Sequence, residues 1–132
     1  DWGHARDYVE MQWRMLQQKE PEDYVIATGR QETVRKFIEM ASIHLGWGGI
    51  EWKGKGIDEI GIRKDTGDVV IRIDERYYRP AEVETLLGNA VKAKNKLGWT
   101  PETTLEELVK EMIESDREEA RRQSMLDSFK DS

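Results

Sequence analysis

The sequence predicts an α+β fold of about four or five helices and two or three short strands. Apolar residues recur at helical spacing in several segments, which indicates amphipathic helices. Short apolar runs with β-branched residues indicate strands, and glycines and prolines separate these segments. No strand–helix–strand series is long enough to form a doubly wound parallel sheet.

The first half of the chain predicts two helices and two strands. Residues 5–16 have helical spacing and are followed by a break at Lys19, Glu20 and Pro21. Residues 24–28, "YVIAT", predict a buried strand, and residues 34–45 predict a firm amphipathic helix. "IEWKGKG", which starts at Ile50, predicts an edge strand that runs into a turn. The apolar positions of the first helix are Ala5, Tyr8, Val9, Trp13 and Leu16.

The middle of the chain is more polar. Residues 57–67 show poor periodicity and predict a loop, whereas residues 69–73, "VVIRI", predict a strand. Pro80 suits the first turn of a helix, because its fixed φ fits there and the missing N–H needs no partner. A short helix is then expected near residues 90–97, ended by Gly98.

The last helix has a capping signature. Thr103 or Thr104 is a suitable cap, with Glu106 or Glu107 three residues later completing a capping box. Its apolar stripe consists of Leu105, Leu108, Val109, Met112 and Ile113. We therefore expect one lobe over residues 1–114 and a charged, frayed tail over residues 115–132.

Composition and charge exclude several classes of function. The chain of 132 residues has a net charge of −6, so a nucleic-acid-binding role is not expected. It has no cysteine and two histidines, which predicts neither a disulfide framework nor a metal site. No apolar run approaches the roughly 20 residues that span a bilayer, and no signal peptide opens the chain. We expect a cytoplasmic protein without membrane partners.

His4 and Asp7 lie three residues apart at the start of the first helix. Two interpretations remain open: an acid/base pair, or side chains that satisfy a helix end.

Arg79 and Glu82 form the main candidate site. A guanidinium beside a helix N-terminus can bind phosphate, and a carboxylate one turn later can accept hydrogen bonds from a ribose or a base. Arg63, Lys64, Arg72 and Arg76 extend the positive charge around Arg79. The alternative is an ordinary surface ion pair three residues apart on a helix, worth about 0.3 kcal/mol.

Several motifs resemble a known family. "DWGHARDYVEMQW", "PEDYVIATG", "VRKFIEMA", "IDERYYRPAEVETLLGNAVKAKNKLGWTP" and "LEELVKEMI" occur in this order over about residues 1–120. They closely resemble the C-terminal part of the GDP-mannose 4,6-dehydratase family, within the extended short-chain dehydrogenase/reductase superfamily. "DYVIATG" and "YYRPAEVE" resemble the GDP-mannose branch most specifically.

The resemblance implies a function. Family members bind NADP in an N-terminal Rossmann domain and bind GDP-mannose mainly through a smaller C-terminal lobe. They convert GDP-mannose to GDP-4-keto-6-deoxy-mannose and are generally homo-oligomers. In the family, the arginine and glutamate of the R-P-x-E motif contact the nucleotide of the substrate. Those positions are Arg79 and Glu82 here.

This chain also departs from the complete family pattern. None of its four tyrosines is followed four residues later by lysine, and the glycine-rich cofactor fingerprint is absent. We therefore expect no catalytic residue and no NADP site in this chain, and no activity from it alone. The start at Asp1 without methionine is typical of a fragment. The alternatives are another GDP-sugar reductase or epimerase of the superfamily, or a non-enzymatic nucleotide-sugar-binding module.

Overall fold

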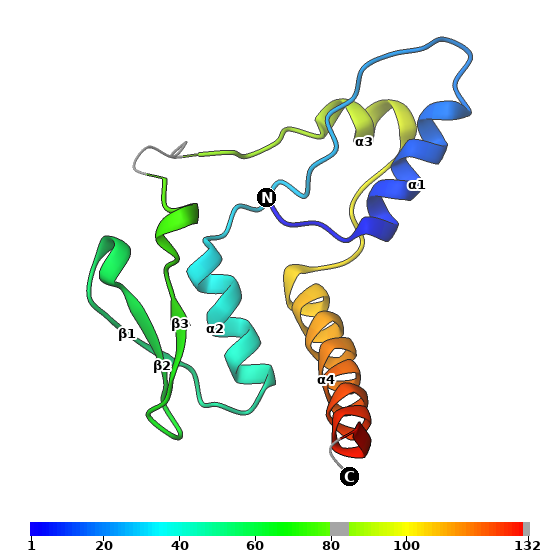
Figure 1. Cartoon of the computed structure of the whole chain (residues 1–132). Helices are drawn as coiled ribbons and strands as arrows, with labels where there is room; N and C mark the ends of the chain where they lie inside the picture. Colours follow the sequence, from blue (N-terminus) through cyan, green and yellow to red (C-terminus); the bar gives the residue numbers. More distant parts are fainter. Residues whose placement is uncertain (80–84, 131–132) are drawn as a thin grey trace. The chain divides into compact units, whose positions relative to one another are not determined.

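The computed structural model of the chain describes residues 1–79 and 85–130 (Figure 1). In these residues it has four α-helices and one three-stranded sheet, which confirms the predicted α+β class. The elements are α1 (Ala5–Leu16), α2 (Val34–His44), β1 (Ile50–Lys53), β2 (Ile60–Arg63), β3 (Val69–Arg72), α3 (Val91–Leu97) and α4 (Leu105–Lys130). Two short 3-10 helices, η1 (Gly56–Asp58) and η2 (Glu75–Tyr77), flank the strands.

The chain divides into two compact units that are interleaved along the sequence. The first unit consists of Asp1–Lys36 and Arg79–Leu108, and the second consists of Phe37–Tyr78 and Val109–Ser132. The division expected at residue 114 stays a prediction.

The core of the first unit lies between α1, α3 and the turn after α3. Met11, Ala93 and Trp99 are its buried centre, and Trp99 is only 1% exposed. Partly buried Tyr8, Met15, Tyr24, Ile26, Ala90 and Leu97 pack around them. Burying a side chain such as Met11 stabilises the fold by about 1.5–3 kcal/mol.

Helices α1 and α3 begin and end where the sequence predicts. His4 precedes α1, and its Nδ1 accepts a hydrogen bond of 3.0 Å from the backbone N–H of Arg6. Gly98 ends α3 with a φ of 63°, in the left-handed region that glycine adopts without a steric penalty.

The sheet belongs to the second unit and is antiparallel in the order β1-β2-β3 (Figure 1). The strands β1 and β3 were predicted, but the expected loop over residues 57–67 was wrong, because it contains the central strand β2. β2 pairs along both of its edges, Trp52 with Gly61 on one side and Gly61 with Ile71 on the other. A Cβ on Gly61 would lie 2.9 Å from the Cβ of Ile71, so the glycine permits close packing.

The strand predicted at residues 24–28 is not present, and this prediction was wrong. Strands require a partner, and within the described chain no backbone group of residues 24–28 pairs with another backbone group. Instead, the carboxylate of Asp1 accepts hydrogen bonds from the N–H of Thr28 at 2.8 Å and of Gly29 at 3.0 Å.

The predicted helix after Arg79 is also not observed where the structure describes the chain. Residues 85–90 have no regular secondary structure. Pro80 and Glu82 lie outside the described residues. Gly88 instead packs closely on Ala27, where a Cβ would come within 2.3 Å of the alanine Cβ. At residues 85–90, a close contact with the segment around Ala27 is found where a helix was expected.

Helix α4 begins with the predicted capping box. The Thr104 N–H donates to Glu107 Oε2 at 2.8 Å, and the Glu107 N–H donates to Thr104 Oγ1 at 3.2 Å. The helix continues to Lys130, so residues 115–130, expected to fray, are helical in this structure.

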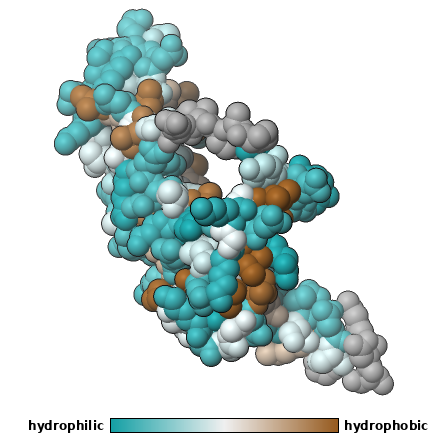
Figure 2. Space-filling view, turned by 90° about the vertical axis from the view of Figure 1, so that its left-hand side faces the viewer, coloured by the Kyte–Doolittle hydropathy of each residue, from teal (hydrophilic) through white to brown (hydrophobic). Residues whose placement is uncertain are grey.

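The surface is mainly hydrophilic, with separate hydrophobic patches in the view of Figure 2. None of the helices in the described residues is long and apolar enough to cross a membrane.

Candidate functional site

Arg79, the first of the two predicted substrate-binding residues, is an exposed side chain in the first unit. It directly follows Tyr78, the C-cap residue of the 3-10 helix η2. Glu82 lies outside the described residues, so the structure neither brings the pair together nor separates it. The nucleotide-binding role of these two residues stays a prediction.

Two of the basic residues before Arg79, Arg63 and Arg76, have local acidic partners. The guanidinium of Arg63 contacts the Asp65 carboxylate at 2.7 Å and stacks 4.5 Å from the centre of the Trp47 ring. The Asp65 partner raises the pKa of Arg63 above its ordinary value. Arg76 likewise contacts Asp74 at 3.2 Å. The charges of Arg63 and Arg76 are therefore neutralised by carboxylates of the second unit. Neither guanidinium is positioned here as a phosphate ligand.

The first unit contains a groove of about 410 Å³. Two stretches distant in sequence form its sides: residues 27–29 and residues 87–91. Lys94, Trp99, Thr100 and Pro101 complete its lining. Apolar walls with a few polar groups are typical of small-molecule sites.

Hydrogen bonds fix both sides of this groove. The Asp1 carboxylate holds the turn at Thr28 and Gly29, and it also accepts a hydrogen bond of 2.7 Å from Thr28 Oγ1. On the opposite side, Asn89 Oδ1 accepts a 3.0 Å hydrogen bond from the N–H of Val91 at the start of α3. The shape of the groove is therefore fixed by polar groups that already form hydrogen bonds within the unit. Lys94 adds a cationic side chain to the lining of the groove.

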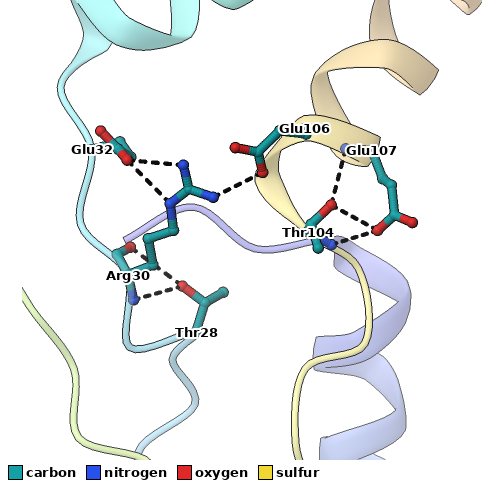
Figure 3. Close-up of polar contacts among 6 residues, drawn as sticks. All are labelled: Thr28, Arg30, Glu32, Thr104, Glu106 and Glu107. Carbon is teal, nitrogen blue, oxygen red and sulfur yellow. Dashed lines mark hydrogen bonds and ion pairs between the residues drawn. The ribbon is translucent and has the colours of Figure 1, made fainter.

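A second, smaller cleft of about 200 Å³ lies beside Arg30 and the start of α4. Arg30 Nη1 contacts Glu106 at 2.8 Å, and Arg30 Nη2 contacts Glu32 at 3.0 Å (Figure 3). Hydrogen bonds from Arg30 lower the pKa of Glu106. The guanidinium is thus shared between two carboxylates, and the cluster holds residues 28–32 against the start of α4.

Asp7 is a structural side chain, and His4 is a helix cap. The Asp7 residue is 3% exposed, and its Oδ2 accepts hydrogen bonds from the N–H groups of Glu102 at 3.1 Å and Thr103 at 2.9 Å. Burial alone would raise the pKa of Asp7, but these hydrogen bonds and the Arg6 charge outweigh it and lower the pKa. Of the two open interpretations, the helix-end reading is supported for His4, and Asp7 orders the turn before α4.

The arrangement in the described residues suits the binding of a polar ligand. The grooves offer cationic groups, hydroxyls and backbone turns held by carboxylates, which can position a polar ligand. The sequence did not indicate this groove, because residues 27–28 were predicted to belong to a strand and residues 87–88 to a helix. Asn89 was the one local signal in the sequence for this side of the groove. It lies two residues before α3, and asparagine is favoured at helix caps.

Comparison with known proteins relates most of the chain to one family. A family model described as GDP-mannose 4,6 dehydratase matches residues 1–112. A GDP-mannose 4,6-dehydratase of Yersinia enterocolitica is 53% identical over 136 residues, covering 96% of this chain and 36% of the relative. One from Vibrio cholerae is 54% identical with the same coverage. The GDP-mannose 4,6 dehydratase of Homo sapiens is 52% identical and covers 89% of this chain and 32% of the relative.

The chain thus spans about a third of the length of these relatives, 36% of the Yersinia protein, and corresponds to their C-terminal part. A family model that covers residues 1–112 includes both sides of the larger groove and the segment that carries Arg79. The chain belongs to the GDP-mannose 4,6-dehydratase family.

Proposed function

We propose that this chain supplies the GDP-mannose-binding part of a GDP-mannose 4,6-dehydratase, which converts GDP-mannose to GDP-4-keto-6-deoxy-mannose. The match of the family model over residues 1–112 carries the proposal, because it includes the segment with Arg79 and Glu82. The names of the bacterial and human relatives support the same substrate.

In this proposal Arg79 binds the diphosphate or its ribose. Guanidinium–phosphate contacts are charge-assisted and often bidentate, so a single arginine can fix the orientation of the nucleotide. Glu82 accepts hydrogen bonds from the nucleoside, because a carboxylate offers only acceptors. Neither residue takes part in proton or hydride transfer, and both act by holding the substrate.

The reaction also needs NADP, which supplies hydride acceptance and return when bound. The described residues do not fit this cofactor, because their sheet is antiparallel and the sequence lacks a glycine-rich strand–helix turn. We therefore propose that NADP and the catalytic groups are held outside this chain, in the part that the longer relatives contain. A homo-oligomeric, cytoplasmic enzyme is part of the same proposal.

The test uses a complete enzyme in which this chain replaces the matching region of the Yersinia enterocolitica relative. Arg79→Ala should raise KM for GDP-mannose about 30-fold, since a charged hydrogen bond contributes about 2 kcal/mol. Glu82→Gln should raise KM in the same direction while NADP affinity stays constant in both variants.

Arg76→Ala is the matched control, because the Arg76 guanidinium contacts Asp74 and lies over the Tyr77 ring. Its KM should remain at the parent value. A parent-like KM in Arg79→Ala would remove Arg79 from the site. A parent enzyme that reduces or epimerises a GDP-sugar, but does not dehydrate GDP-mannose, would replace the proposed reaction.

A further inference from the structure

The chain enters Arg79 from a closed turn, the 3-10 helix η2, whose C-cap residue is Tyr78. The N–H of Tyr77 donates to the carbonyl of Asp74 at 3.0 Å, and the N–H of Tyr78 donates to the carbonyl of Glu75 at 3.1 Å. These two hydrogen bonds fix the backbone conformation of the turn. The main chain immediately before the predicted substrate ligand is therefore ordered by local contacts.

A side-chain cap closes the first end of the same turn. Asp74 Oδ1 accepts a hydrogen bond of 2.9 Å from the N–H of Arg76, and Asp74 Oδ2 contacts the Arg76 guanidinium at 3.2 Å. The guanidinium lies 4.5 Å from the centre of the Tyr77 ring, which is 70% exposed. The contacts of these three side chains therefore stay within the turn.

Tyr78 makes a contact with a part of the sequence outside this turn. A Cβ on Gly56 would lie 3.7 Å from the Tyr78 hydroxyl, which is an ordinary van der Waals distance. Because Gly56 has no side chain, the tyrosine packs against the backbone of the 3-10 helix η1. The turns η1 and η2 lie at the same end of the sheet (Figure 1).

The turn η1 is a firm support for this tyrosine. The N–H of Glu59 donates a hydrogen bond of 3.2 Å to the carbonyl of Gly56, and β2 begins at the next residue, Ile60. β2 is the central strand and pairs with both β1 and β3. The segment before Arg79 is therefore held at two points of one sheet, through the chain at β3 and through Tyr78 at η1.

An ordered approach to Arg79 favours ligand binding. Arginine has many rotamers, and the loss of this freedom on binding opposes affinity. A main chain that is already fixed at the base of the side chain lowers this entropic cost before the ligand arrives.

We propose that Tyr78 is a positioning residue for Arg79, because its packing on Gly56 holds the base of the arginine that binds the nucleotide. The inference rests on the proposed function, in which Arg79 contacts GDP-mannose. It assigns no contact with the substrate to Tyr78 itself.

A double-mutant cycle in the complete chimera with the Yersinia relative tests this proposal. Tyr78→Ala removes the packing and should raise KM for GDP-mannose about fivefold, the factor expected for ordering one long side chain. The kcat and the NADP affinity should stay at their parent values. In the Arg79→Ala background, Tyr78→Ala should raise KM no further, since no arginine remains to be positioned.

Two substitutions at neighbouring tyrosines serve as controls. Tyr78→Phe keeps the ring and loses only the terminal oxygen, so it should raise KM far less than Tyr78→Ala. Tyr77→Ala removes an exposed ring whose contact is with Arg76 of the same turn, and its KM should stay at the parent value.

A second pair of variants loosens the turn without altering Tyr78. Asp74→Ala removes the oxygen that accepts from the Arg76 N–H, and it should raise KM in the same direction as Tyr78→Ala. Asp74→Asn keeps an acceptor oxygen at this position and should retain the parent KM. Raised KM in neither Asp74→Ala nor Tyr78→Ala would contradict the inference.

The outcomes distinguish this inference from the proposed function. Equal KM increases from Tyr78→Ala in the parent and in the Arg79→Ala background would overturn the inference, because Tyr78 would then act independently of Arg79. A lower kcat at saturating GDP-mannose would assign Tyr78 a general structural role instead. A parent-like KM in Tyr78→Ala beside a raised KM in Arg79→Ala would refute the positioning role alone. A parent-like KM in Arg79→Ala would refute both.

Discussion

The indole Nε1 of Trp99 donates a hydrogen bond of 2.9 Å to the backbone carbonyl of Asp7, across 92 residues of sequence. The Asp7 carboxylate in turn accepts from the backbone of Glu102 and Thr103. The segments "DWGHARD" and "LGWTP" therefore contact each other directly. These hydrogen bonds order the first unit and give both motifs a structural role.

Replacing the buried carboxylate tests this interlock. Asp7→Asn should lower the free energy of unfolding by about 1.5–3 kcal/mol, because an amide N–H₂ replaces an acceptor of charged hydrogen bonds. Urea denaturation of the chain measures the loss. Asp116→Asn, at an exposed position of α4, should change stability little. Equal stability of the Asp7→Asn variant would refute the role of Asp7.

The same carboxylate should make stability depend on pH. Because folding lowers the Asp7 pKa, the ionised form favours the folded state, and its contribution is present above the ordinary aspartate pKa. The contribution is lost as pH falls through about 4 toward the lower folded pKa. The stability difference between the parent chain and Asp7→Asn should therefore shrink between pH 5 and about 3. A difference that grows on acidification would reverse the sign and contradict the assignment.

Removing the indole donor tests the other half of the contact. Trp99→Phe should cost about 1–3 kcal/mol, since it deletes a hydrogen bond and leaves a gap in a filled core. Thermal unfolding followed by circular dichroism measures the change. Trp13→Phe in the isolated chain is the control, because that ring is largely exposed. Similar losses in the two variants would show that Trp99 is not part of the core.

The close approach of residues 27 and 88 predicts a rescue experiment. Gly88→Ala should destabilise the chain by about 1–3 kcal/mol, because its Cβ would overlap that of Ala27. Ala27→Gly removes the obstructing methyl group, so the double variant should recover part of the loss. Strictly additive losses in the double-mutant cycle would mean that the two segments do not touch.

The start of α4 depends on Thr104. Thr104→Ala removes the hydroxyl that accepts from the Glu107 N–H, and it should cost about 1 kcal/mol. Ser115→Ala, on the exposed surface of the same helix, should have little effect. Chemical denaturation distinguishes the two, and an equally small loss at Thr104 would argue against the capping box.

Local sequence features were enough to predict α1, α2, α3 and the start of α4, but not the helical continuation of α4 to Lys130. Residues 5–16 and 34–45 carry their own periodicity, and Gly98 and the Thr104–Glu107 box mark ends through contacts within one turn. Strands were less predictable because pairing is non-local. The polar segment 57–67 yields the central strand β2 when β1 and β3 pair with it, whereas the apolar segment 24–28 finds no partner in the described residues.

The candidate site was likewise predictable only where its residues form a local pattern in the sequence. Arg79 and Glu82 were identifiable because a motif is a local pattern, and the family followed from such motifs. The groove between residues 27–29 and 87–91 was not identifiable, because two segments about 60 residues apart line it.

Local sequence patterns established the family, the ends of α1 and α3, the start of α4 and the α+β class, because propensity, capping and motif residues act over a few neighbours. Contacts between distant segments established that Asp7 and Trp99 interlock, that Gly88 meets Ala27, and that α1 buries Met11 while it exposes Trp13. Periodicity shows that a helix has an apolar surface. Which part of that surface is covered depends on the segments that fold against it.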